Sequence, residues 1–143
     1  MATLTSANSI VLLTVTGLYP VPVPLQGYAT DDAFATEEVQ SGETMMGVDG
    51  KLSAGFTPYP VPLIITLQAD SESNSIFDTW IGAELRNRNK YVVDASVLVQ
   101  GTGELFTFTK GYLTKFISMP EGKKVLQPRR FTMEFEEMTK GPI

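Results

Sequence analysis

Two pairs of adjacent carboxylates are the side chains in this sequence that come closest to a catalytic arrangement. Asp31 and Asp32 form the first pair, and Glu37 and Glu38 form the second. Glycoside hydrolysis needs only two carboxyl groups, one acting as an acid and the other as a base or nucleophile. The pairs lie in the polar run ATDDAFATEE, however, and adjacent acidic residues in such a run are typical of a solvated loop. We therefore expect no enzyme activity from them.

The residue types that serve most other active sites are missing from the sequence. The chain contains no cysteine and no histidine, which excludes disulfides, zinc–thiolate sites, Ser-His-Asp and Cys-His arrangements, and the usual general base near neutral pH. No glycine spacing fits a phosphate-binding loop or a dinucleotide-binding fingerprint. Asp49 lacks the additional acidic ligands of a calcium loop. Lys110 and Lys115 are expected to project from a strand into solvent. We expect no cofactor and no metal.

The charge of the chain is divided between two parts of the sequence. The formal net charge is −5, which argues against a protein that binds nucleic acid by neutralising phosphates. Residues 1–50 contain six acidic residues and no lysine or arginine, whereas residues 86–130 contain nine basic and three acidic residues. Two interpretations remain open. The two parts form solvated faces, or the acidic surface of one copy meets the basic surface of the next in a head-to-tail association.

One amphipathic helix is predicted at about residues 74–88. Its apolar side chains recur at helical spacing and include the single tryptophan of the chain. Ser75 and Asp78 have the spacing of a capping box, and Ser73 is an alternative N-cap. The residues expected on the core face of this helix are Ile76, Phe77, Trp80, Ile81 and Leu85. A helix with one apolar face needs a sheet to lie against.

Seven or more strands are predicted from alternating apolar and polar residues bounded by turn signals. The predicted segments are 9–18, 19–28, two halves of a hairpin within 39–55, 60–69, 91–100, 104–117 and 130–138. Asp49-Gly50 is the hairpin signal, and Gly111 is a candidate β-bulge. Prolines at every second position of YPVPVP predict a sheet edge or a crossing between sheets. The fold class is therefore mainly β: a two-sheet β-sandwich or a partly closed β-barrel with one flanking α-helix.

The length of 143 residues predicts a single domain over residues 1–143. Residues 1–8 are small and polar, and we expect a flexible N-terminal arm there. The apolar run Ile10–Leu13 is too short for a membrane span, and no basic residue precedes it. We therefore expect a soluble protein, made in the cytoplasm, with no membrane anchor.

Four stretches of the sequence resemble a known family. They are LQGYATDDAF (residues 25–34), GVDGKLSAG (47–55), LQADSESNSIFDTW (67–80) and KKVLQPRRFTMEF (123–135). In this order they are similar to the tail tube proteins of contractile-tailed bacteriophages, which are small structural proteins of about this length. The resemblance implies a β-sandwich with a flanking helix, assembled as hexameric rings that stack into a hollow tube inside a contractile sheath.

The resemblance also implies partners and a location. The partners would be further copies of the chain, the sheath protein, the tape-measure protein and the baseplate, and genomic DNA would pass through the tube without specific binding. The location would be the tail of the virion, with assembly in the host cytoplasm. We hypothesise that Asp31, Asp32, Glu37 and Glu38 face the lumen, because a wall of carboxylates repels phosphates within a Debye length of about 8 Å.

Contacts between copies are expected in two segments. The loop at residues 39–53 is expected to reach an adjacent ring, and the basic segment 86–90 is expected to contribute a second contact. The candidate residues are Glu43, Met45, Met46, Asp49, Lys51, Arg86, Arg88 and Lys90.

Two alternative functions remain open. One is a monomeric β-sandwich binding module, for example for carbohydrate, although the single tryptophan is assigned to the helix core and leaves no evident stacking platform. The other is a related phage tail piece, such as a tail terminator or a baseplate subunit, which composition does not distinguish from a tube protein. The state of assembly distinguishes the three.

Overall fold

The computed structural model describes residues 9–26, 28 and 34–142. The expected flexible arm at residues 1–8 lies outside the described residues. The described elements are β1 (Ile10–Val15), β2 (Tyr19–Pro24), β3 (Phe34–Thr36), β4 (Gly42–Met46), β5 (Leu52–Phe56), β6 (Val61–Leu67), α1 (Asn74–Asn87), β7 (Val93–Val99), β8 (Glu104–Phe116) and β9 (Arg129–Pro142). This confirms a mainly β fold with one helix in the described part of the chain.

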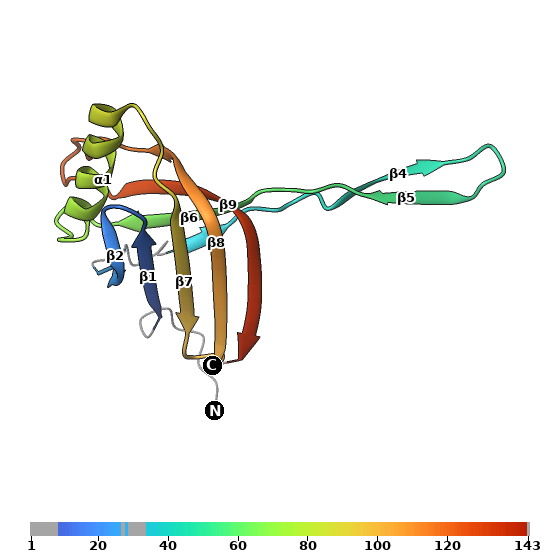
Figure 1. Ribbon diagram of the computed structural model, residues 1–143, viewed down its shortest axis with the longest axis horizontal. Helices are drawn as coiled ribbons and strands as arrows, with labels where there is room; N and C mark the ends of the chain where they lie inside the picture. The colour runs from blue at the N-terminus through green and yellow to red at the C-terminus, as the bar shows by residue number, and fades with distance from the viewer. Residues whose placement is uncertain (1–8, 27, 29–33, 143) are drawn as a thin grey trace.

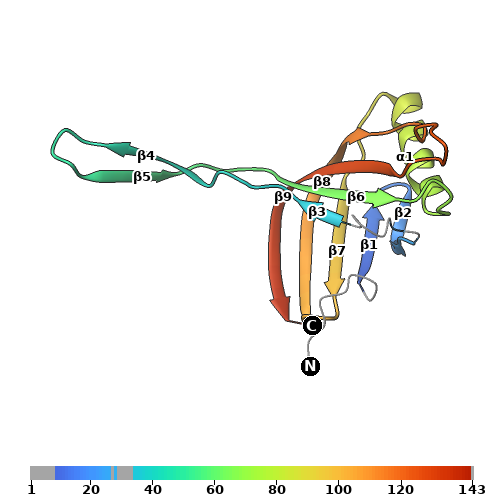
Figure 2. The same cartoon turned by 180° about the vertical axis from the view of Figure 1, so that it is seen from behind.

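Seven strands form one continuous sheet in the order β2-β1-β7-β8-β9-β6-β3, and every neighbouring pair is antiparallel. The long strands β8 and β9 bend, so that the sheet folds back over itself (Figures 1 and 2). The described strands do not close into a barrel, because β2 and β3 remain as opposite edges. The second sheet contains β4 and β5 and projects from the body instead of packing against the first.

A β-bulge accompanies the bend in β8. The register between β7 and β8 shifts between Val93 and Ala95, which leaves one extra residue in β8. Lys110 lies at the shift with a φ of 49°, and its N–H donates a hydrogen bond to Asp94 Oδ1 at 2.8 Å. The bulge was predicted at Gly111, which is the next residue along the strand.

The hydrophobic core lies on the inner face of the bent sheet, beneath α1. Alternate residues of β1, β6, β7 and β9 point inward, and the largest fully buried side chains are Trp80, Phe77, Phe108, Phe131 and Phe135. The Phe77 ring stacks on Phe131 with a centroid distance of 4.0 Å, and Trp80 lies 5.9 Å from Phe77. Burial of these aromatic side chains stabilises the packing of the helix against β9.

The predicted core face of the helix is correct for Phe77 and Trp80 and wrong for Leu85. Ile76 and Ile81 are half-buried, but Leu85 is 63% exposed. The buried positions of α1 are Asn74, Phe77, Trp80 and Ala83, a stripe with a spacing of three residues. Leu85 is two residues beyond Ala83, roughly 200° further round the helix, and therefore faces away from the sheet.

The start of the helix also differs from the prediction. Ser73 occupies the N-cap position, but its side chain makes no capping hydrogen bond. Its Oγ instead accepts a hydrogen bond from the N–H of Gln26 at 2.8 Å, which ties the helix start to the segment after β2. The Ser75–Asp78 capping box is wrong, because the Ser75 hydroxyl donates to the carbonyl of Glu72 and the Asp78 carboxylate pairs with Arg129.

The proline-rich segment forms an edge of the main sheet, as its spacing predicts. Strand β2 pairs with β1 and has no second neighbour among the described strands. The N–H of Leu25 donates to the carbonyl of Val11 at 2.9 Å, so by alternation Pro22 and Pro24 turn their nitrogens outward. An edge without these donors is a poor template for a further strand.

Candidate functional site

The most prominent surface feature is a hairpin that stands away from the body, which we call the arm (residues 37–60). Its strands β4 and β5 pair antiparallel from Gly42–Phe56 to Met46–Leu52. Figures 1 and 2 show the arm extending from the side of the molecule opposite α1. A two-stranded hairpin without other contacts is marginally stable in water, so the arm is suited to contact a partner.

The tip of the arm is a three-residue hairpin loop, Val48–Gly50. The N–H of Gly47 donates to the carbonyl of Lys51 at 2.8 Å, and Gly50 has a φ of 84°. The Asp49 carboxylate accepts the N–H of Lys51 at 3.1 Å. The Asp-Gly hairpin predicted from the sequence is thereby confirmed, with one residue more than the tightest form. The turn leaves the Val48 side chain fully exposed at the end of the arm.

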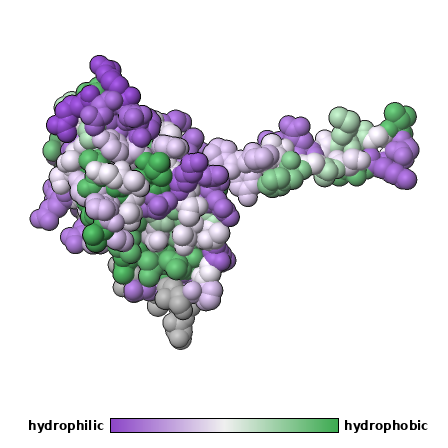
Figure 3. All heavy atoms as spheres, in the orientation of Figure 1, coloured by the Kyte–Doolittle hydropathy of each residue, from purple (hydrophilic) through white to green (hydrophobic). Residues whose placement is uncertain are grey.

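Large apolar side chains are exposed along the arm. Met45 and Phe56 are 77% and 78% exposed, and Met46 and Leu52 are exposed cross-strand partners. Figure 3 shows hydrophobic residues gathered on the outer part of the arm. Exposed apolar groups that adjoin one another mark interaction surfaces more often than isolated ones do.

The structure places the predicted contact residues in two separate regions. Glu43, Met45, Met46, Asp49 and Lys51 lie together on the arm, whereas Arg86, Arg88 and Lys90 lie at or just beyond the carboxyl end of α1. The ammonium group of Lys90 is already bound within the chain. It donates to Glu84 Oε1 at 3.0 Å and to the carbonyl of Leu113 at 2.8 Å. Lys90 is therefore less available to a partner than its sequence position indicates.

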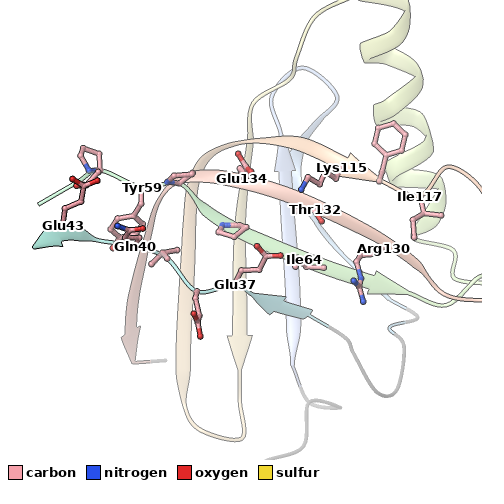
Figure 4. A pocket seen from close by; sticks show the side chains of 17 residues that line it. Glu37, Gln40, Glu43, Tyr59, Ile64, Lys115, Ile117, Arg130, Thr132 and Glu134 are labelled. Atoms are coloured by element: carbon pink, nitrogen blue, oxygen red, sulfur yellow. The ribbon is translucent and has the colours of Figure 1, made fainter.

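A groove of about 700 Å³ lies at the root of the arm, against the outer face of β6 and β9 (Figure 4). Carboxylates of Glu37, Glu38, Glu43 and Glu134 line it together with the basic side chains of Lys115 and Arg130. Apolar side chains such as Ile64 and Ile117 complete the wall. The groove is open and carries charge of both signs, so it resembles a contact surface more than a catalytic pocket.

The structure describes only one of the two carboxylate pairs predicted from the sequence. Glu37 and Glu38 follow β3 and line the groove, whereas Asp31 and Asp32 lie outside the described residues. Within the described part of the chain, no cluster of acidic side chains could hold a metal ion. The same residues include no helix that is long and apolar enough to cross a membrane.

A second exposed surface, which sequence reasoning missed, lies where β8 connects to β9. We call it the β8–β9 end. It consists of Met119, Lys123, Lys124, Val125 and Leu126, all of them exposed. A hollow of about 500 Å³ lies beside Val125 and Leu126 and is also lined by residues 68–70. Apolar residues next to lysines in KKVLQP are the sequence signal that could have indicated it.

Two side chains with shifted pKa values lie away from the arm. Burial raises the pKa of the Tyr28 hydroxyl to about 12. A hydrogen bond from Lys140 lowers the pKa of Glu104, which links the start of β8 to the end of β9. Both shifts have local structural causes, so neither indicates a catalytic group.

Comparison with solved structures shows the same fold in contractile assemblies. A chain in the baseplate of the anti-feeding prophage aligns with a TM-score of 0.65 and 11% identity, covering 99% of this chain and 98% of that one. A chain in the tube-terminating cap of the anti-feeding prophage aligns with a TM-score of 0.62 and 12% identity, covering 100% of this chain and 93% of that one. A chain in the sheath–tube complex of an extracellular contractile injection system aligns with a TM-score of 0.60 and 10% identity, covering 93% of this chain and 88% of that one.

Comparison with sequences adds the family. A search of curated proteins found no match. Residues 2–139 match the family described as Tail fiber protein gp32. The expected likeness to phage tail proteins is confirmed by this match together with the shared fold. The match covers nearly the whole chain, and the protein therefore belongs to the tail fiber protein gp32 family.

Proposed function

We propose that the chain is a structural subunit of a phage tail tube. Copies would form hexameric rings, and the rings would stack into a hollow tube inside a contractile sheath. Three observations support this role: the sequence resemblance to tail tube proteins, membership of a phage tail family, and a fold shared with a chain of a sheath–tube complex. The role is structural and requires no enzyme activity and no cofactor.

The observation that carries the proposal is the exposed arm. Its apolar side chains, Met45, Met46, Val48, Leu52 and Phe56, have no cover within the described chain. In a homo-oligomer each copy provides the same arm and the same receiving surface, so one contact repeated around and along a tube covers every arm. Burial of this apolar area is the main driving force available for association.

Acidic residues suit the inner wall of such a tube. Asp31, Asp32, Glu37 and Glu38 are our candidates for the lumen, where carboxylates repel the phosphates of passing DNA. Arg86 and Arg88 remain candidates for contacts between copies. The further partners would be the sheath, the tape-measure protein and the baseplate, and the assembled protein would reside in the virion tail after assembly in the host cytoplasm.

A second candidate function is a different tail component with the same fold. Chains of a tube-terminating cap and of a baseplate align with this one as well as the sheath–tube chain does, and the family description names a tail fiber. A terminator would stop at one ring. A monomeric binding module is the alternative from another class, and it would remain a single copy.

Light scattering at several concentrations, combined with negative-stain electron microscopy, distinguishes these functions. A tube protein gives stacked rings or hollow filaments whose mass grows with concentration. Single rings that do not stack favour a terminator. A uniform monomer at high concentration contradicts the proposed self-assembly and favours the binding module.

A further inference from the structure

We infer that the β8–β9 end of one copy receives the arm tip of the next copy. This inference rests on the proposed self-association and adds the surface that takes part in it. The occupant is a second copy of this chain, and the contact joins two different surfaces of the same molecule.

The two surfaces lie at opposite sides of the body. Strand β6 begins at Val61, close to where the arm joins the sheet, and ends at Leu67, which pairs with Arg129. The connection between β8 and β9 ends just before Arg129, beside α1. Figure 1 shows the arm and this connection on opposite sides of the molecule. Surfaces placed in this way form a head-to-tail contact that continues from copy to copy, whereas a two-fold dimer would stop at two.

Apolar side chains match between the two surfaces. The tip presents Met46 and Val48, and the β8–β9 end presents Val125 and Leu126, which are 71% and 58% exposed. The hollow of about 500 Å³ beside Val125 and Leu126 has room for a side chain of the size of Val48. Exclusion of water from both sets of side chains would favour the contact.

The two surfaces also carry charges that can pair. The tip of the arm carries Asp49 beside Lys51, whereas the β8–β9 end carries Lys123 and Lys124 beside Glu121. The ion pair between Lys123 and Glu121 spans 3.8 Å, and both side chains are mostly exposed, so it holds Lys123 only weakly. Opposite charges steer two copies into this orientation. The groove at the arm root is a poorer receiver, because four carboxylates line it.

The receiving surface is held in place by the rest of the fold. The side chain of Arg129 donates to the carbonyl of Ile117 at 3.0 Å and pairs with Asp78 of α1. The N–H of Gln127 donates to the carbonyl of Glu121 at 3.0 Å. A connection ordered before binding loses less conformational entropy when a partner docks.

Cross-linking tests the inference directly, because the chain contains no cysteine. One preparation carries Val48→Cys and another carries Leu126→Cys, and both positions are exposed. The two are mixed under assembly conditions and treated with a short thiol-reactive cross-linker. Each preparation alone is one control, and Val48→Cys mixed with Thr102→Cys, an exposed site in the β7–β8 turn, is the matched control.

We expect the mixture of Val48→Cys and Leu126→Cys to yield at least tenfold more cross-linked dimer than the control mixture. Equal yields from protein that assembles by light scattering would overturn the inference and leave the proposed function intact. Protein that does not assemble at all would overturn the proposed function as well.

Charge reversal provides a second measurement. Lys123→Glu combined with Lys124→Glu should lower the association constant about tenfold, because exposed ion pairs each have a modest effect and repulsion replaces two of them. Adding Asp49→Lys at the arm tip should restore part of the loss. Unchanged association of the charge-reversed protein would contradict the inference.

Discussion

Arg129 at the start of β9 forms two hydrogen bonds with Asp78 in the middle of α1. Nη2 lies 2.8 Å from Oδ1, and Nη1 lies 3.2 Å from Oδ2. The Arg129 side chain is only 5% exposed, and its guanidinium also lies 5.0 Å from the centre of the Phe131 ring. This pair joins the helix to the strand that follows the β8–β9 end, and it therefore supports the surface that we assign to assembly.

Replacement of Asp78 by alanine should lower the free energy of unfolding by about 2–3 kcal/mol. The change leaves the Arg129 guanidinium buried without its carboxylate partner, a loss moderated because Asp78 itself is about half exposed. Denaturant unfolding measures the change. Glu121→Ala, which removes the exposed pair with Lys123, is the matched control and should change the stability by less than about 0.5 kcal/mol. Equal effects of the two substitutions would contradict this explanation.

Gly111 should not tolerate a side chain. A Cβ at this position would overlap the Phe135 ring, so Gly111→Ala forces a core aromatic residue to move and should cost about 1–3 kcal/mol. Gly141→Ala in β9 meets no atom within 4 Å and is the control. Thermal unfolding of both variants measures the difference. A Gly111→Ala protein as stable as the control would show that the close contact does not constrain β8.

Polar substitutions on the arm should abolish assembly without unfolding the body. Met46 and Leu52 are cross-strand partners and are 63% and 62% exposed, so replacing both by serine removes apolar surface from the arm and leaves the core intact. We expect light scattering to report single copies, with a melting temperature within a few degrees of the unaltered protein. Undiminished assembly would mean that the arm is not an essential contact.

The Tyr28 hydroxyl should ionise at a higher pH than an exposed tyrosine hydroxyl does. Burial raises the pKa of its hydroxyl from 10.0 to about 12. A raised pKa means that the folded state retains its proton more strongly, so this contribution to stability is fully present below pH 10 and is lost as the pH rises through 12. Ultraviolet titration of the phenolate, compared with Tyr28→Phe, measures it. A titration of Tyr28 near pH 10 in the folded protein would contradict the burial effect.

Local patterns predicted the elements of this fold better than their arrangement. Alternation placed Val11, Leu13 and Val15 inward, and all three are buried. The prolines of β2 predicted an edge. Such features depend on the residue and its immediate neighbours. The bend of β8 lies instead where Gly111 pairs with Phe135, a residue distant in sequence, and no local pattern shows that one sheet folds over itself.

The candidate surfaces show the same division. Asp49-Gly50 predicted the hairpin, because the turn is local, but whether that hairpin packs on the body or stands away from it depends on the whole chain. Val125 and Leu126 are only two adjacent apolar residues, and the sequence alone does not show whether such a pair is exposed or lies buried in a strand. Leu85 was misplaced because the packed stripe of α1 follows a three-residue spacing set by the sheet beneath it.

Electron cryo-microscopy of the assembled protein tests the central claim most directly. We expect hollow tubes of stacked rings, in which the arm of each copy is covered and its tip contacts the β8–β9 end of another copy. A protein that stays monomeric, or an assembly whose arms remain uncovered by other copies, would contradict it.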